Sequence, residues 1–253
     1  MNFFTALFKT PAKMLAKAIQ KAPYPISHVQ EIVPFTPKSN TGTLICRQAY
    51  CTNYDEDAKI PIWVAYTLKP EYLKAPLKRK DSFQTDFSLP SGKRSELVDY
   101  RNSNYDTGHM ANDADMSWDQ QVQKESFILT NMAPQTAALN RGSWKALENH
   151  TRKTVETYNK ELVIFCGNIW TSNSETIGPN KVVVPDQCWK VIYSPSANVY
   201  NAYIFDNNTH HMALELIQGT ELQKFRIELS KLEALTDLQF EMVQSPGFEP
   251  GTP

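Results

Sequence analysis

Short runs of β-branched and aromatic residues recur along most of the chain, and turn-forming or polar residues separate them, a pattern typical of strands. The runs that predict strands are 43–47, 50–54, 62–68, 127–130, 162–169, 181–193 and 200–205. Helical spacing is found over residues 140–158, where Trp144, Leu147 and Val155 recur on one side, and at the beginning of 221–232. Many strands and few helices predict an α+β fold with a mixed sheet.

Residues 76–104 follow neither a helical nor a strand period and contain many polar side chains. We therefore expect a long irregular segment at this place in the chain. Because loops of this length in compact domains are often functional, the segment is a candidate part of a binding site.

The first 25 residues differ from the rest of the chain, because lysines recur every fourth position and no acidic residue precedes Glu31. The lysines are Lys9, Lys13, Lys17 and Lys21. With apolar residues between them, the pattern predicts a basic amphipathic helix that Pro23 and Pro25 end. The predicted organisation is this segment over 1–27, a main domain over 28–243 and a flexible, Pro/Gly-rich tail over 244–253.

The role of the N-terminal segment is left open by its pattern. It is consistent with a targeting presequence, a membrane-surface anchor, a helix that docks on a protein partner, or a solvated terminal helix. A secretory signal is disfavoured because the basic residues follow the apolar stretch, and the lack of arginine weakens the mitochondrial interpretation. The compartment therefore stays undecided, with mitochondrial and membrane-associated locations favoured over secretion.

Composition narrows the classes of protein but does not identify one. The chain has 253 residues, of which 41% are hydrophobic and 21% charged, as in ordinary globular domains. No apolar run is long enough to predict a transmembrane helix. A net charge of -1 argues against a protein that coats nucleic acid, although residues 69–80 carry five basic side chains against Glu71 alone, so a local basic cleft is compatible with it.

The four cysteines do not have the spacing of a structural zinc site. Cys46 and Cys51 are placed to face each other across a hairpin as a disulfide, and reduced buried thiols are the other interpretation. Cys166 and Cys188 lie in apolar runs, which favours structural roles over a nucleophilic thiol.

The segment 105–110, YDTGHM, is the most informative stretch of the chain and places His109 directly after a glycine. A neutral histidine suits the deprotonation of water near neutral pH. Phosphodiester hydrolysis also needs positive charge at the phosphate, which Mg²⁺ supplies with only one or two protein oxygens as ligands. The amide of Asn140, at the beginning of a predicted helix, is a plausible anchor, and Glu148 two turns later would reach the ion through water.

Each of these residues also has a purely structural interpretation. A lone histidine is more often a hydrogen-bonding residue of the fold than a catalyst, and Asn131 and Asn140 are of a type that often caps turns and helices. Glu148 and Arg152 are four positions apart on a helix and are placed to form an ordinary ion pair. What the structural interpretation does not explain is their joint occurrence in one order along the chain.

The segment 106–109, DTGH, resembles the DRGH motif of the DNA/RNA non-specific endonuclease family. The resemblance covers roughly residues 43–240. It continues at Asn131, Pro134, Gln135, Asn140, Gly142, Trp144 and Glu148, and in the segments 61–64, 79–86, 184–185, 189–190 and 235–238. The resemblance implies the ββα-metal fold, with a central mixed, mostly antiparallel sheet flanked by helices.

The resemblance implies a role for each residue at the centre of the motif. His109, within a motif that begins at Asp106, is implied to be the general base. Asn140 is implied to be the direct ligand of Mg²⁺, with Mn²⁺ as the alternative ion. Glu148 would reach the ion through water, and Asn131 would position the imidazole. The implied reaction cuts DNA and RNA through phosphate contacts and leaves 5′-phosphate and 3′-hydroxyl ends.

Arginines are the second group of implied functional residues. Arg79 and Arg152 match arginines that contact phosphate, whereas Thr107 stands where the family usually has arginine. The loss of one charged hydrogen bond is worth about 1.5–3 kcal/mol, or roughly ten- to a hundredfold in rate. The nearby arginines that are candidates to replace it are Arg94, Arg101 and Arg141.

Two hypotheses of different classes follow from these residues. The first is a metal-dependent endonuclease, with an exonuclease of the same family and a homodimer as narrower options. The second is a weak or inactive pseudo-nuclease that serves as a nucleic-acid binder or a structural subunit of an assembly. Thr107 and the near-neutral charge motivate the second hypothesis, and the intact His109, Asn140 and Glu148 favour the first.

Overall fold

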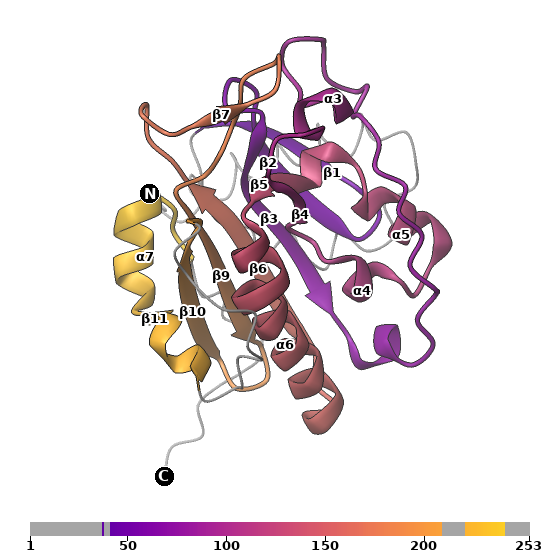
Figure 1. The fold of residues 1–253 in the computed structure, drawn as a ribbon. Helices are drawn as coiled ribbons and strands as arrows, with labels where there is room; N and C mark the ends of the chain where they lie inside the picture. The colour runs from indigo at the N-terminus through magenta and orange to yellow at the C-terminus, as the bar shows by residue number, and fades with distance from the viewer. Residues whose placement is uncertain (1–36, 38–40, 209–220, 241–253) are drawn as a thin grey trace, which may run out of the picture.

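A seven-stranded sheet is the centre of the computed structural model, which describes residue 37, residues 41–208 and residues 221–240 (Figure 1). Its strands, in spatial order, are β1 (Thr43–Cys46), β2 (Tyr50–Asp55), β3 (Ile60–Leu68), β6 (Leu162–Ile169), β9 (Gln187–Ser194), β10 (Val199–Asp206) and β11 (Arg226–Ile227). Every neighbouring pair in this sheet is antiparallel, so the predicted α+β fold with a mostly antiparallel sheet is confirmed.

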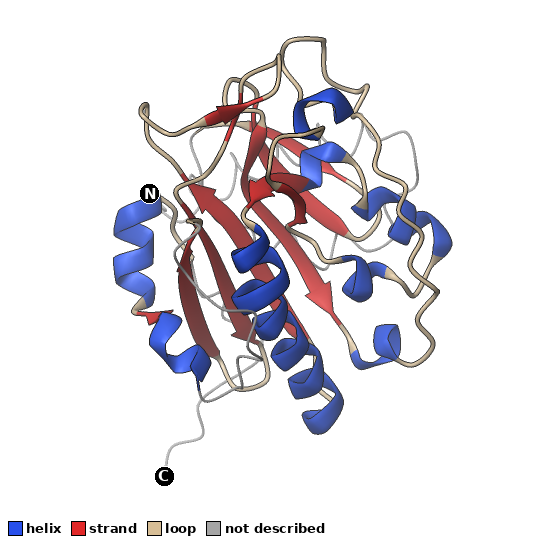
Figure 2. Ribbon diagram, in the orientation of Figure 1, coloured by secondary structure: helices blue, strands red, loops and turns tan. Residues whose placement is uncertain are grey.

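The central strands are buried on both faces, which explains why they appear in the sequence as nearly continuous apolar runs. The helix α6 (Lys145–Tyr158) lies over one face of the sheet, as Figure 2 shows. Trp144, directly before α6, is almost completely buried and packs edge-to-face on Phe205 of β10. The core therefore lies between this helix and the sheet, and it holds α6 in a fixed position.

The remaining elements are short. The short helices are α3 (Leu97–Tyr100), α4 (Asp113–Met116), α5 (Gln120–Ser126), α7 (Leu229–Thr236), the π-helical turn Leu139–Trp144 and the 3-10 turns Pro70–Leu73, Leu129–Asn131 and Glu221–Phe225. Two small antiparallel pairs complete the fold: β4 (Asp106–His109) with β5 (Met132–Gln135), and β7 (Thr176–Ile177) with β8 (Val182–Val183).

Two of the predicted strands are wrong in their extent or type. The apolar run 127–130 is not a strand: Phe127 ends α5 and a 3-10 turn follows, because the amide of Ile128 donates to the carbonyl of Glu125 and that of Asn131 to Ile128. The run 181–193 divides into β8 and β9, because Pro185 has no amide hydrogen to donate to a ladder.

The C-terminal helix also begins later than predicted. Residues 221–232 contain a 3-10 turn and the short strand β11 before α7 begins at Leu229. The predictions for residues 1–27 and 244–253 lie outside the described residues. In the part of the chain that the structure describes, no helix is long and apolar enough to cross a membrane.

Cys46 and Cys51 form a disulfide across the β1–β2 hairpin, where they are paired opposite each other. Of the two interpretations, a disulfide or two reduced thiols, the structure therefore contains the disulfide. Cys166 and Cys188 are free and buried, and burial raises the pKa of each thiol to about 12. Burial and a raised thiol pKa both agree with structural roles for Cys166 and Cys188.

The long irregular segment over 76–104 is confirmed except for the short helix α3. A buried ion pair fixes its middle, because the Arg47 guanidinium binds the carboxylate of Asp86. The same carboxylate accepts hydrogen bonds from the Thr130 hydroxyl at 2.7 Å and from the backbone and hydroxyl of Ser88. Asp86 therefore joins the loop to the hairpin and to the turn before β5.

Removal of this carboxylate is expected to destabilise the fold. Asp86→Ala leaves the buried guanidinium of Arg47 without its charge partner, which typically costs about 3–5 kcal/mol. Asp81→Ala is the matched control, since its exposed pair with Arg79 should contribute less than about 1 kcal/mol. Urea denaturation of the two variants tests this, and equal free energies of unfolding would contradict it.

Candidate active site

The strand β4 carries His109, and the glycine before this histidine leaves room for a buried side chain of β5. Gly108 pairs with Ala133 in the strand register, and a Cβ at Gly108 would lie 2.2 Å from the side-chain oxygen of the buried Gln135. The pairing of His109 with Met132 continues this register. The absence of a side chain at Gly108 therefore lets the Gln135 side chain pack against β4 at the position before His109.

The imidazole of His109 is buried against aromatic rings. Its ring lies edge-on to Phe127, with centroids 4.8 Å apart, and Phe83 packs at 5.5 Å. Burial, with the positive charge of Arg79, lowers the pKa of His109 to about 3. The imidazole is thus neutral near pH 7, and its buried Nε2 has no hydrogen-bond partner among the described residues.

The helical segment opposite His109 begins irregularly. Leu139–Trp144 forms a π-helical turn in which Gly142 has the non-helical angles φ -101° and ψ -108°, and regular α6 follows. Such π-turns often occur at functional sites. The irregular turn places the side chains of Asn140 and Arg141 beside β4, at the edge that carries Asp106.

The carboxylate of Asp106 binds both of these side chains. It accepts a hydrogen bond from Nδ2 of Asn140 at 2.9 Å, and from Nε and Nη2 of Arg141 at 2.8 and 2.6 Å. Partial burial raises the pKa of Asp106, but the hydrogen bonds from Arg141 and Asn140 outweigh it and leave the pKa below its usual value. Because an ionised carboxylate only accepts, this contact fixes the orientation of the Asn140 amide and leaves its oxygen without a donor among the described residues.

The carboxylate of Glu148 is buried at the middle of the same site. It accepts from Nδ2 of Asn112 at 2.5 Å and lies 3.5 Å from Nζ of Lys190, which is itself buried and stacked over Trp144. Burial raises the pKa of Glu148, and the charges of Lys190 and Arg152 oppose that effect. Lys190 on β9 therefore compensates the negative charge of Glu148, a buried residue of α6.

Two arginines are held near Glu148 by separate carboxylates. Arg152 donates to Asp115 at 2.7 Å and to the side-chain oxygen of Asn112 at 3.2 Å. Arg79 lies over the ring of Phe127 and 3.7 Å from Asp113. Both guanidinium groups are therefore oriented by the protein itself.

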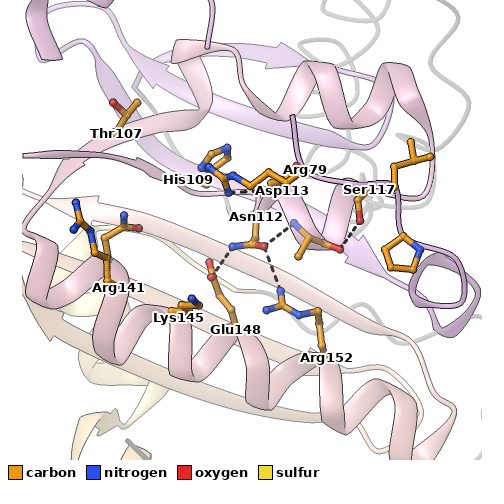
Figure 3. A pocket seen from close by; sticks show the side chains of 14 residues that line it. Arg79, Thr107, His109, Asn112, Asp113, Ser117, Arg141, Lys145, Glu148 and Arg152 are labelled. Carbon is orange, nitrogen blue, oxygen red and sulfur yellow. Dashed lines mark hydrogen bonds and ion pairs between the residues drawn. The ribbon is translucent and has the colours of Figure 1, made fainter. Parts of the chain in front are cut away.

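These side chains line one cavity of about 430 Å³, as Figure 3 shows from close by. The charged and polar residues that line it are Arg79, Thr107, His109, Asn112, Asp113, Ser117, Asn140, Arg141, Lys145, Glu148 and Arg152. In this view His109 and Arg79 lie on one side, with Glu148 and Asn112 facing them. The cavity combines a neutral base, oxygen ligands and cationic groups, which suits chemistry on an anionic phosphate ester.

Comparison with known proteins agrees with this chemistry. The family model described as DNA/RNA non-specific endonuclease matches residues 29–245. The chain belongs to this family.

Similar curated proteins include human mitochondrial endonuclease G, 28% identical over 208 residues that cover 77% of this chain and 68% of the relative. A Nostoc nuclease is 30% identical and covers 81% of this chain and 76% of its own length. The nuclease of Serratia marcescens is 27% identical, with 79% and 75% covered.

A solved structure gives the same result for the fold. The crystal structure of the EndoG/EndoGI complex, described as showing the mechanism of EndoG inhibition, contains a chain with a TM-score of 0.73 and 28% identity to this one. The match covers 83% of this chain and 89% of that chain. The fold expected from the resemblance is therefore confirmed, and the chain is a non-specific DNA/RNA endonuclease, a hydrolase of phosphodiester bonds.

The structure brings most of the predicted site residues of this endonuclease together. His109, Asn140, Glu148, Arg79 and Arg152 all line the cavity. Asp106 contacts it through Asn140 and Arg141, as described above.

Asn131 does not contact the imidazole. Its amide bonds to the backbone nitrogen and oxygen of Ala111 and to the carbonyl of Ser126, so any effect on His109 passes through the main chain.

Several residues of the endonuclease site were not found from the sequence. They are Asn112, Asp113 and Lys145, together with Lys190, which the sequence motif included without a role. Asn112 lies only three residues after His109, but its importance comes from contacts to Glu148 and Arg152, about 40 residues later in the chain. The sequence signal, an asparagine beside a histidine motif, was too general to reveal this.

The protonation state of His109 can be measured directly. Since burial and Arg79 hold its pKa at about 3, the imidazole should stay neutral at about pH 5, where an ordinary histidine is protonated. Nitrogen NMR of labelled histidines follows the titration, and comparison with His109→Asn assigns the signal. Protonation with a midpoint near 6.5 would show that the imidazole is solvated instead.

Proposed function

We propose that this endonuclease hydrolyses DNA and RNA in a Mg²⁺-dependent reaction in which His109 is the general base. The observation that carries the proposal is that His109 and Asn140 line one cavity, that the His109 imidazole is neutral with an unpartnered Nε2, and that the amide oxygen of Asn140 has no donor among the described residues. A general base needs a free lone pair and a hard cation needs a free oxygen, and residues of this one cavity offer both.

The residues fit Mg²⁺ better than a softer ion. Asn140 offers an amide oxygen as the direct ligand, while both oxygens of Glu148 already accept from Asn112 and Lys190, which suits a contact through water. No group of three or more His, Cys, Asp and Glu that could hold a metal ion occurs among the described residues. Mn²⁺ prefers similar oxygen ligands and is the alternative.

When bound, Mg²⁺ would supply positive charge at the phosphate and at the leaving oxygen. His109 would accept a proton from the attacking water as the new P–O bond forms. The bond to the 3′ oxygen then breaks, which leaves a 5′-phosphate and, after protonation, a 3′-hydroxyl. Arg79, which pairs with Asp81 at 2.8 Å and lies 3.7 Å from Asp113, and Arg152, which Asp115 holds, would bind the phosphate oxygens.

The absence of sequence preference in the family agrees with this arrangement. Guanidinium and ammonium groups at the cavity contact phosphate, which is the same for every base and for both sugars. Arg79, Arg141, Lys145 and Arg152 provide positive charge locally although the net charge of the whole chain is -1.

The cellular compartment and the assembly of the protein are separate proposals. The mitochondrial name of the human relative favours a mitochondrial location over the membrane surface for this chain. A homodimer and a membrane or protein partner for residues 1–25 stay predictions, which the described residues do not address.

The function is tested by cleavage of supercoiled plasmid and of single-stranded RNA with Mg²⁺ and with EDTA. His109→Ala should lower the rate by about 10²–10⁴-fold, the usual contribution of a general base. His150→Ala, an exposed histidine on α6, is the matched control and should cut like wild type.

The second candidate is a pseudo-nuclease, which the threonine at position 107 favours. Folded wild-type protein that cuts neither substrate with any divalent ion would support this candidate and contradict the proposal. Cleavage that persists in EDTA would contradict the metal requirement alone.

A further inference from the structure

We infer that Arg141 provides the phosphate-binding guanidinium that Thr107 cannot provide. The inference rests on the proposed function and assigns one further residue to it. Thr107 and Arg141 line the same cavity, and Figure 3 shows both at the end of the site that lies opposite Arg152. A threonine carries no charge and reaches less far than arginine, so this end depends on another residue for positive charge.

The other candidate arginines are occupied or distant from the cavity. Arg94 donates to the carbonyl of Leu89 and to Glu96, and it stacks on Phe87. Arg101 is exposed in a turn, and neither arginine lines the cavity. Of the three candidate arginines, only Arg141 therefore lines the cavity with Thr107.

Asp106 holds the guanidinium of Arg141 in place, but part of the guanidinium has no hydrogen-bond partner among the described residues. Asp106 binds its Nε and Nη2, whereas no described residue accepts a hydrogen bond from Nη1, and 64% of the side chain is exposed. Arginine binds carboxylate and phosphate through a planar fork of donors, so the free edge remains available for a phosphate oxygen. Pairing with Asp106 orders this flexible side chain before the substrate arrives, which lowers the entropic cost of binding.

The position next to the metal ligand supports this role. Arg141 follows Asn140 in the chain, and both side chains bind the same carboxylate. Arg141 and Arg152 line the cavity at opposite ends, so a phosphate held there would have a guanidinium toward each end (Figure 3). Such an arrangement neutralises charge that develops in the transition state.

A reciprocal exchange of residues tests the inference in the full chain. Arg141→Gln should lower kcat/KM for plasmid cleavage by about ten- to a hundredfold, the effect of one charged hydrogen bond. The double variant Thr107→Arg with Arg141→Gln should recover at least about tenfold of that loss, because it restores a guanidinium at the same end of the cavity. Arg101→Gln, which removes an exposed arginine away from the cavity, is the matched control and should cut like wild type.

A second readout separates phosphate binding from a merely structural role. The salt dependence of KM should become shallower in Arg141→Gln by about one phosphate contact, and the thermal midpoint should be unchanged because the pair with Asp106 is exposed. Wild-type activity in Arg141→Gln, or no recovery in the double variant, would overturn the inference. A wild-type chain that cuts no substrate would instead contradict the proposed function itself.

Discussion

The carboxylate of Asp106 connects the two halves of the site, because it belongs to the strand of His109 and binds side chains of the helical turn that carries Asn140. A carboxylate accepts hydrogen bonds and donates none while ionised, so the amide of Asn140 can present only its nitrogen to Asp106. The amide oxygen is then the free atom. One anionic group thereby determines which atom of Asn140 is available as a ligand, and it also orders the guanidinium of Arg141. Contacts behind a metal ligand commonly have this orienting effect.

Buried charge is balanced locally throughout the rest of the site. Glu148 has Lys190 and Arg152 nearby, and Arg152 in turn binds Asp115. Isolated buried charges are costly, so each partner makes the burial of the other tolerable. Asn112 joins the network by donating to Glu148 and accepting from Arg152. The neutral imidazole of His109 lies among aromatic rings at the edge of this network, where no charge of its own needs compensation. A substrate phosphate would therefore enter a cavity whose charges are already arranged.

The sequence predicted the parts of the fold that depend on local pattern. The central strands were found because burial on both faces makes them nearly continuous apolar runs, and α6 because its buried side imposes a helical period on its apolar residues. The run 127–130 was misread because its apolar residues are buried in a turn, held by local backbone bonds and by contact with Gln84. The short helices α4 and α5 were missed because they depend on the caps Asn112 and Asp119 more than on an apolar face. In the site, most of the motif residues were brought together as expected, with Asn131 the exception, whereas contacts between distant segments, such as that of Asn112 with Glu148, have no local signal.

The orienting role of Asp106 is tested most directly by the concentration of Mg²⁺ that gives half-maximal plasmid cleavage. If Asp106 fixes the Asn140 amide, Asp106→Ala should raise this concentration by about ten- to a hundredfold, the usual effect of losing a partner behind a metal ligand. Asn140→Ala should raise it at least as far, and Asp106→Asn, which keeps an acceptor oxygen, should raise it less. An unchanged Mg²⁺ requirement in Asp106→Ala would contradict the account.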